Sequence, residues 1–151
     1  MIPALVDLAR NSKFVMAHSF NAMLEVSVAI ILDDQRRVLI SQRALHKPHG
    51  GYFEFPGGKI EANESPEQAL IREMVEELGI DLTNFKYLSS ILHDYHDKQV
   101  KLHIFLISKY KGQPRCCDGQ IALEWKAIED LQDLKFPEAN FKIIDLILKV
   151  I

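Results

Sequence analysis

Glu73, Glu76 and Glu77 are the residues of this chain whose type and spacing most suggest chemistry. Side chains at i, i+3 and i+4 of a helix share one face, with Cβ atoms about 5 to 6 Å apart, so these carboxylates repel one another. A divalent cation would neutralise them, and carboxylate oxygens suit Mg²⁺ or Mn²⁺, which also bind phosphate oxygens. The alternative for the three glutamates taken alone is a solvated acidic helix face.

A helix must carry these carboxylates, and the sequence contains signals for both of its ends. Ser65 can cap the start, Gln68 can complete a capping box, and Pro66 suits the first helical position. Gly79 suits the left-handed residue that ends a helix, so the helix should run to about Leu78. Its apolar stripe consists of Ala69, Leu70, Ile71, Met74, Val75 and Leu78.

The turn before this helix, Phe55-Pro56-Gly57-Gly58, favours the metal site over the solvated face. Glycines permit positive φ and let a backbone carbonyl approach a ligand closely. Gly58, five residues, Glu64, seven residues and the run from Arg72 to Ile80 together resemble the complete signature of the Nudix family. The resemblance implies an α+β fold, an α/β/α sandwich with a mixed β-sheet.

The resemblance also implies roles for particular residues in a nucleotide hydrolase. Glu73, Glu76 and Glu77 are expected to hold the metal with the Gly57 carbonyl, and Arg72 is expected to orient one carboxylate. An exposed Arg72–Glu76 pair is the structural alternative. The general base comes from the box or from a later loop. Asp118 is the loop candidate, and its structural alternative is a turn former.

Three further segments resemble the MutT branch of the family: Glu54 to Glu61, Ser65 to Ala69, and Phe136 to Asn140. This resemblance implies Mg²⁺-dependent hydrolysis of 8-oxo-dGTP to 8-oxo-dGMP and pyrophosphate, with Mn²⁺ as a possible substitute. A MutT-like enzyme acting on CTP or on modified pyrimidine triphosphates is the alternative. A nucleotide sensor without activity fits less well, because such proteins usually lose box glutamates and this chain keeps them.

The same resemblance implies a set of nucleotide-binding residues. Asn140 corresponds to the asparagine that reads the base; its amide can match the N7–H donor and O6 acceptor of the 8-oxo base. Its structural alternative is a helix N-cap, and that of Arg43 is an exposed cation at a strand end. Pro48 stands where the branch has a nucleotide-contacting histidine, with His49 next to it, so that contact is a departure. The expected set is Arg43, Glu54, Phe55, Pro56, Gly57 and Asn140.

The composition sets limits on partners and location. A net charge of −3 and a pI near 6.1 give no basic footprint for duplex nucleic acid. No apolar run reaches the roughly 18 residues of a membrane span, and no signal peptide is evident. Adjacent Cys116 and Cys117 are poorly placed for a disulfide, which suits a reducing cytoplasm. The oligomeric state stays open.

The rest of the chain reads as one domain, residues 24–151, after an N-terminal extension of uncertain structure, residues 1–23. The first two strands, residues 24–32 and 37–42, should form a hairpin across a turn at 33–36. A second hairpin or a meander is expected from the strands at 85–95 and 99–110. The remaining expected elements are strands at 52–55 and 122–127, a helical turn at 129–134 and a helix at 140–150.

Overall fold

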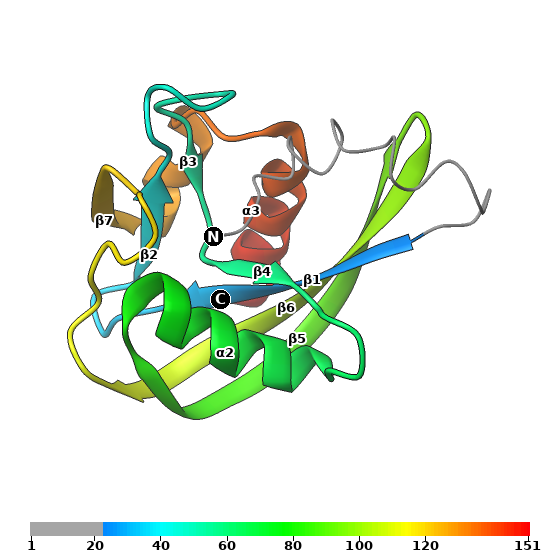
Figure 1. Cartoon of the computed structure of the whole chain (residues 1–151). Coiled ribbons are helices and arrows are strands. Elements are labelled where there is room, and N and C mark those ends of the chain that lie inside the picture. The colour runs from blue at the N-terminus through cyan, green and yellow to red at the C-terminus, as the bar shows by residue number, and fades with distance from the viewer. Residues whose placement is uncertain (1–22) are drawn as a thin grey trace.

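The computed structural model describes residues 23–151 (Figure 1). The expected N-terminal extension lies outside these residues except for Met23, which begins the first strand. The described elements are β1 (Met23–Ile31), β2 (Arg37–Gln42), β3 (Phe53–Glu54), β4 (Gly57–Lys59), α2 (Pro66–Leu78), β5 (Asp81–Tyr95), β6 (Lys98–Lys111), β7 (Ala122–Ala127), the 3₁₀ helix η2 (Ile128–Asp133) and α3 (Glu138–Val150).

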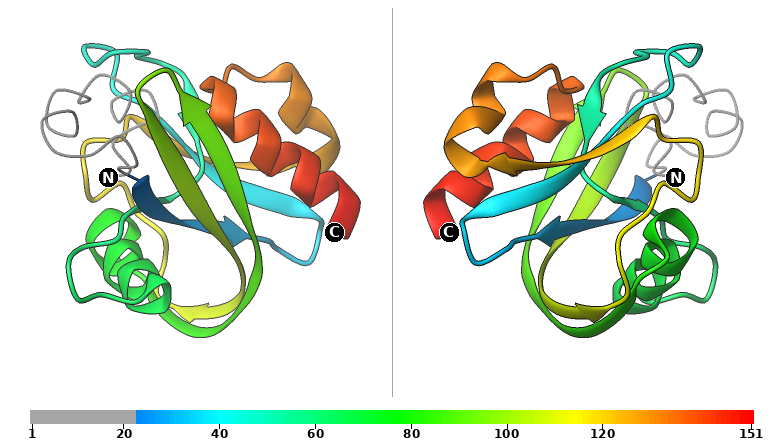
Figure 2. Two further views of the ribbon diagram at one scale, coloured as in Figure 1. Left: turned by 90° about the vertical axis from the view of Figure 1, so that its right-hand side faces the viewer. Right: turned by 90° about the vertical axis from the view of Figure 1, so that its left-hand side faces the viewer.

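The strands form a four-stranded sheet in the order β4-β1-β6-β5 and a three-stranded sheet in the order β3-β2-β7. β1 and β6 run parallel, whereas the other pairs are antiparallel. Helices α2 and α3 lie on opposite faces of the four-stranded sheet (Figures 1 and 2). The expected mixed sheet and α/β/α sandwich are therefore confirmed.

The second half of strand β1, residues 28–31, is apolar at every position because both of its faces are covered. Val28 and Ile30 belong to the core that includes α3, whereas Ala29 and Ile31 belong to the core under α2. Successive side chains of a strand point to opposite faces, so a strand between two helical layers needs apolar residues at every position. This strand also positions the candidate site, because β4, which contains Gly57 and Gly58, pairs with one of its edges.

The expected hairpin of β1 and β2 is wrong, because the two strands belong to different sheets. A single bridge, Leu32 to Val38, is the pairing between them. The tight turn does form, with Asp33 Oδ1 accepting hydrogen bonds from the backbone N–H of Gln35 (2.9 Å) and Arg37 (2.8 Å). Both edges of β1 are already paired, with β4 and β6, so β2 is directed away. The hairpin of β5 and β6 is confirmed.

Helix α2 has the expected ends but a different buried face. The capping box of Ser65 and Gln68 is present, and Gly79 ends the helix with φ of 68°. Ile71 and Val75, expected in the apolar stripe, are 42% and 47% exposed. The reason is that α2 contacts the protein on two sides: Leu70, Met74 and Leu78 lie under the sheet, and the adjoining side faces β4 and carries buried glutamates.

Candidate active site

Glu77 is a fully buried carboxylate at the end of α2. Its Oε2 accepts a hydrogen bond from the Gly57 N–H at 3.0 Å. Its Oε1 is also buried and has no hydrogen-bond partner among residues 23–151. Burial raises the pKa of Glu77 well above its ordinary value, and the nearby carboxylates of Glu54 and Glu73 raise it further. A buried acid with one oxygen lacking a donor is suited to bind a cation.

Glu73 lies one helical turn earlier, against the double-glycine turn. Its side chain is 8% exposed, and a Cβ on Gly58 would overlap the Glu73 carboxyl group. Gly57 has φ of 150°, and a Cβ there would overlap the Ser27 carbonyl. The two glycines therefore let β4 approach both β1 and the carboxylates of α2. Burial raises the pKa of Glu73, although a hydrogen bond from Arg72 opposes that shift.

Arg72 holds several carboxylates together. Its Nε and Nη2 donate to the two Glu64 oxygens at 2.7 and 2.9 Å, so this contact is bidentate. Nη1 donates to Glu73 Oε1 (2.8 Å) and Glu76 Oε2 (3.2 Å), and Nη2 also donates to the Lys59 carbonyl (2.9 Å). These hydrogen bonds lower the pKa of Glu64 and raise the pKa of Arg72. The exposed Arg72–Glu76 pair given as the alternative is present, but it is one part of a network in which Arg72 also bonds Glu64 and Glu73.

Glu76 differs from the other two helix glutamates because its side chain is 57% exposed. Within the described part of the chain, no group of three or more His, Cys, Asp or Glu side chains forms a ready-made metal cage. Mg²⁺ usually takes one or two carboxylates together with waters and substrate phosphates. Glu73 and Glu77 with a solvent-facing Glu76 fit that kind of open site better than a closed one.

Asp118 lies in the loop between β6 and β7, and this loop rests on the end of α2. The Cys117 N–H donates to the Glu77 carbonyl (3.1 Å) and the Arg115 N–H to the Leu78 carbonyl (2.9 Å). Asp118 is therefore the residue directly after Cys117, whose N–H is bonded to the Glu77 carbonyl. Cys116 and Cys117 of this loop are both exposed free cysteines.

Gln120 was missed by the sequence reasoning. Its Nε2 donates to the Glu77 carbonyl at 3.0 Å, and its Oε1 accepts from the Asp118 N–H at 2.9 Å. A single glutamine after a glycine carries no recognisable pattern, so only the tertiary contact reveals it.

Arg43 is buried rather than an exposed cation at a strand end, so that alternative is wrong. Its Nε donates to the Pro48 carbonyl at 2.7 Å, and its Nη1 lies 4.0 Å from Glu54 Oε2. At the position where the MutT branch has a histidine, Pro48 thus contributes its backbone carbonyl to Arg43. His49 has φ of 55° and places its ring edge-on against Tyr52, with centroids 5.0 Å apart.

The expected base-contacting strand meets the segment before α3. Phe55 is fully buried and stacks on Phe136 at 5.5 Å, and Pro56 is buried next to it. The Phe53 N–H donates to the Lys135 carbonyl at 2.8 Å. In this structure Phe55 and Pro56 form the support of the site rather than its open surface.

Asn140 is buried near the start of α3, but it is not the N-cap of that helix. The N-cap is Pro137, whose carbonyl accepts from the Asn140 N–H (3.0 Å) and from its Nδ2 (3.4 Å). The N-cap alternative for Asn140 is therefore wrong. Since Phe136 stacks on Phe55, the segment that carries Asn140 and strand β3 come together from distant parts of the sequence.

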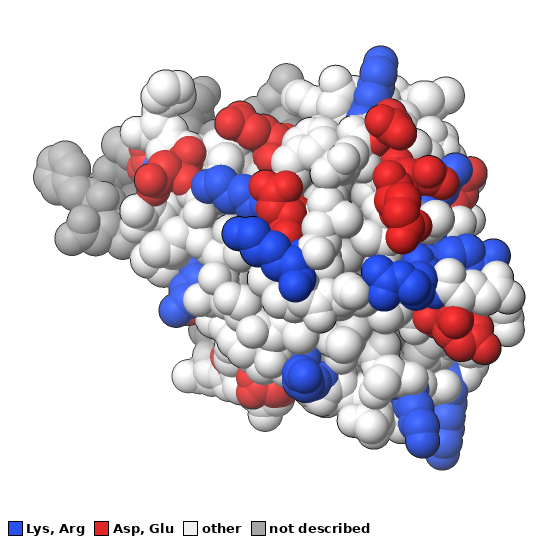
Figure 3. Space-filling view, turned by 180° about the vertical axis from the view of Figure 1, so that it is seen from behind, with Lys and Arg blue, Asp and Glu red and all other residues white. Residues whose placement is uncertain are grey.

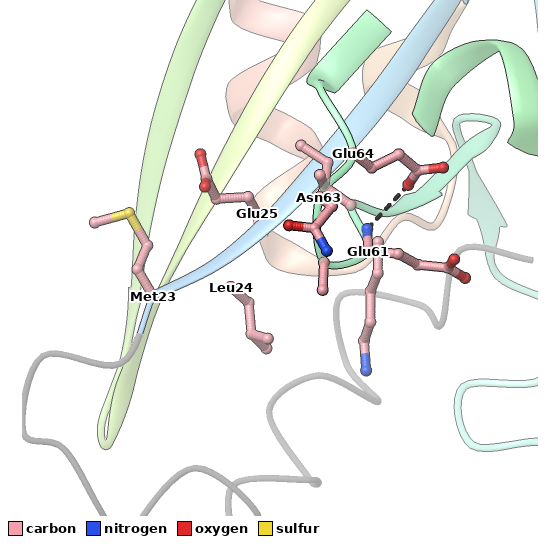
Figure 4. A pocket seen from close by; sticks show the side chains of 9 residues that line it. Met23, Leu24, Glu25, Glu61, Asn63 and Glu64 are labelled. Carbon is pink, nitrogen blue, oxygen red and sulfur yellow. Dashed lines mark hydrogen bonds between the residues drawn. The ribbon is translucent and has the colours of Figure 1, made fainter. Parts of the chain in front are cut away.

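A pocket of about 350 Å³ lies beside the loop that leads into α2 (Figure 4). Its lining includes Glu25 from β1 and Glu61 to Glu64 from the loop, where the Glu61 N–H donates to Glu64 Oε1 at 2.9 Å. None of the three α2 glutamates lines it. The pocket nevertheless adjoins the carboxylate cluster, because Glu64 lines it and Arg72 bonds both Glu64 and Glu73.

Among residues 23–151, no helix combines the length and apolar character needed to cross a membrane.

Comparisons with known proteins agree with this geometry. A family model described as NUDIX domain matches residues 23–147. The chain is 44% identical to the 8-oxo-dGTP diphosphatase of Proteus vulgaris over 60% of this chain and 80% of that protein. It is 35% identical to the 8-oxo-dGTP diphosphatase of Escherichia coli K12, over 80% and 93% of the two chains.

Two further comparisons concern the substrate alternative and the fold. A CTP pyrophosphohydrolase of Escherichia coli K12 is 32% identical over 82% of this chain and 90% of that protein. A solved structure from a study of MutT from Aliivibrio salmonicida and Vibrio cholerae superposes with a TM-score of 0.74 at 35% identity. That match covers 86% of this chain and 100% of the other.

Proposed function

The chain belongs to the NUDIX family, and from this premise we propose that it hydrolyses 8-oxo-dGTP to 8-oxo-dGMP and pyrophosphate. The observation that carries the chemistry is the buried Glu77 carboxylate, with one oxygen on the Gly57 N–H and the other lacking a donor among the described residues. Several relatives named for this activity support the substrate. The enzyme would remove an oxidised nucleotide from the pool before it reaches DNA.

Nudix hydrolases use divalent metal ions, and we propose Mg²⁺ for this one, with Mn²⁺ as a substitute. A bound divalent ion polarises a phosphoryl oxygen and lowers the pKa of a bound water. Glu73, Glu76 and Glu77 would hold it, together with the Gly57 carbonyl. Arg72 keeps the Glu73 and Glu76 carboxylates oriented, through hydrogen bonds of 2.8 and 3.2 Å. Mg²⁺ prefers hard oxygen ligands, and both these protein groups and the phosphates of the substrate supply them.

Asp118 is our candidate for the group that accepts a proton from the attacking water. Its loop is bonded to the end of the helix that carries Glu77, through the Cys117 N–H and the Gln120 side chain. A general base must lie within hydrogen-bond reach of the water it activates, directly or through one further water. The loop contacts are what would keep Asp118 at the rim of the carboxylate cluster.

Asn140 is our candidate for recognition of the oxidised base, with Arg43, Glu54, Phe55, Pro56 and Gly57 forming the surrounding site. The 8-oxo base carries hydrogen on N7, where guanine has an acceptor, so an amide can accept from N7–H while donating to O6. Asn140 is buried at 3% exposure, which favours selection by complementary hydrogen bonds. Phe55 and Phe136 fix the strand and segment around it.

The free nucleotide, rather than duplex DNA, is the proposed partner. The chain carries a net charge of −3, and the face seen in Figure 3 mixes acidic and basic side chains without one continuous basic surface. Duplex binding depends mainly on such basic surfaces. A cytoplasmic location would place the enzyme with its substrate.

A direct comparison of substrates tests this proposal. We expect kcat/KM for 8-oxo-dGTP to exceed that for dGTP and for CTP when each is measured at limiting concentration with Mg²⁺. Products should be the monophosphate and pyrophosphate. A higher kcat/KM for CTP would favour the alternative pyrimidine triphosphatase, and binding of 8-oxo-dGTP without pyrophosphate release would favour a sensor.

A further inference from the structure

The carbonyl groups at the end of α2 are satisfied by the loop between β6 and β7. The last carbonyls of a helix have no partners within the helix and must find them elsewhere. Here the Gly79 N–H donates to the Val75 carbonyl at 3.0 Å, and the Ile80 N–H donates to the Met74 carbonyl at 3.3 Å. The carbonyl of Glu77 lies beyond these and is bonded by the loop instead.

Two of the loop contacts come from backbone, but one comes from a side chain. The Cys117 and Arg115 N–H groups donate to the Glu77 and Leu78 carbonyls. Gln120 is buried, with 8% of the residue exposed, and its Nε2 donates to the same Glu77 carbonyl at 3.0 Å. Because the backbone contacts persist when a side chain is replaced, Gln120 can be tested separately from the rest of the loop.

The other end of the Gln120 amide accepts from the Asp118 N–H at 2.9 Å. One planar group thus connects the backbone of Glu77 to the backbone of Asp118. The next residue, Ile121, donates its N–H to the Gln42 carbonyl at 3.0 Å, directly before Arg43. The loop is therefore held at both sides of Asp118, by α2 and by β2.

We propose that Gln120 is a positioning residue that sets the place of Asp118 relative to the Glu77 carboxylate. This inference rests on the proposed function, because it concerns the base of that reaction. Gln120 itself touches neither substrate nor metal in this scheme. A simple structural role, in which Gln120 only satisfies a helix carbonyl, would affect stability without a particular effect on turnover.

Gln120→Met is the primary variant, because methionine has a similar length but neither a comparable donor nor a comparable acceptor. We expect kcat for 8-oxo-dGTP to fall about 10- to 100-fold with KM nearly unchanged, since small misplacements of a catalytic group have effects of this size. Gln120→Asn keeps both polar groups of the amide but is too short to reach both partners. Because it can still bond one of them, kcat should fall less than in Gln120→Met. Gln120→Asn also keeps the test decisive if the methionine lowers the folded fraction.

Gln99→Met is the matched control. Gln99 donates from Nε2 to Asp94 Oδ1 at 2.7 Å at the end of the β5–β6 hairpin. The Gln99→Met variant therefore also loses a hydrogen bond of a glutamine amide, but at a place away from Asp118. We expect wild-type kcat for it. A fall in kcat for Gln99→Met as large as for Gln120→Met would overturn the assignment.

A double-mutant cycle with Asp118→Asn decides whether Gln120 acts through Asp118. Groups that act as a unit are strongly non-additive, so Gln120→Met should lower kcat by less than about 2-fold in the Asp118→Asn background. Full additivity, or wild-type kcat for Asp118→Asn alone, would overturn the inference. Failure of the proposed function is distinguishable, because then wild-type protein itself would show no Mg²⁺-dependent release of pyrophosphate from 8-oxo-dGTP.

Discussion

The Glu77 carboxylate accepts one hydrogen bond, from the Gly57 N–H, while its other oxygen is buried with no partner among the described residues. Burial of a charge is costly unless that charge is paired. In the absence of metal, the protein keeps Glu77 protonated to a higher pH than an exposed glutamate, because burial raises its pKa. Catalytic sites often contain such destabilising groups, and the bound cation compensates for them.

Because burying the Glu77 charge is costly, we expect Glu77→Gln to lower activity and to raise the stability of the metal-free protein. Between the ordinary pKa of 4.5 and the raised pKa, the native state holds a proton that the unfolded chain has lost. Metal-free wild-type protein should therefore lose stability as pH rises through that range. Glu77→Gln should remove this decline, raise the melting temperature in EDTA at pH 8, and lower kcat at least about 100-fold.

Glu76→Gln is the control for this prediction, since that side chain is 57% exposed on the same helix. Its melting temperature in EDTA should follow the wild-type pH dependence. Thermal melts from pH 5 to 8 measure both variants. A Glu77→Gln protein that retains the wild-type decline with pH would show that Glu77 is not the group responsible.

Asn140→Ala should reduce the preference for the oxidised base. A matched pair of hydrogen bonds to a base discriminates by about 1 to 3 kcal/mol, so the ratio of kcat/KM values for 8-oxo-dGTP and dGTP should fall about 5- to 150-fold. The dependence of kcat on Mg²⁺ concentration should change little. Equal losses for both nucleotides would instead indicate that Asn140 mainly orders the start of α3.

At the scale of elements, the site depends on how closely β4 approaches α2. Gly57 pairs with Val28 of β1, and Gly58 leaves the space that the Glu73 carboxylate occupies. A strand that carried side chains at these positions would hold the helix away. The two glycines thus serve the packing of one element on another, in addition to the turn that precedes the helix.

Gly58→Ala should separate β4 from α2, since the new methyl group overlaps the Glu73 carboxyl group. We expect kcat to fall about 100-fold, together with a loss of stability of about 1 to 3 kcal/mol. Gly112→Ala is the control: Gly112 has φ of 98°, so the variant is also strained, but its nearest contact is the Gly79 carbonyl at 3.2 Å. If steady-state kinetics show equal losses of kcat in both, strain rather than the carboxylate contact is responsible.

At the scale of the whole molecule, the candidate site draws on both sheets and on several loops. α2 rests on the four-stranded sheet, whereas Arg43 and Glu54 come from the end of β2 and from β3. The Asp118 loop joins β6 of one sheet to β7 of the other. A ligand that contacts all of these parts stabilises the fold as a whole, because it binds the native state and not the unfolded chain.

Mg²⁺ should raise the melting temperature of the wild-type protein in a concentration-dependent way, because its proposed site exists in the native state and not in the unfolded chain. At 100 times its dissociation constant, a ligand at one site adds about 2.7 kcal/mol to the free energy of unfolding. Excess EDTA should reverse the effect, and Glu77→Gln should abolish most of it. An equal Mg²⁺ shift in the Glu77→Gln protein, measured by thermal melting, would place the ion elsewhere.

The sequence by itself determined helix α2, from the Ser65 cap to Gly79, and the carboxylates that it carries. These features depend on contacts within a few residues, where residue type largely decides the conformation. The family signature and the nature of the chemistry followed from the same segment. The sequence also indicated the β5–β6 hairpin, because a short polar segment separates its two strands; in the structure the connection is a two-residue turn.

Only the tertiary structure decided which of the three glutamates on this face of α2 are buried. It placed Glu77 against Gly57 and left Glu76 exposed, directed β2 away from β1, and brought the Asp118 loop onto the end of α2 through Gln120. Each of these outcomes depends on partners far apart in the chain. Burial, and with it the raised pKa of Glu77, is a property of the packed layers around a residue, so local spacing cannot specify it.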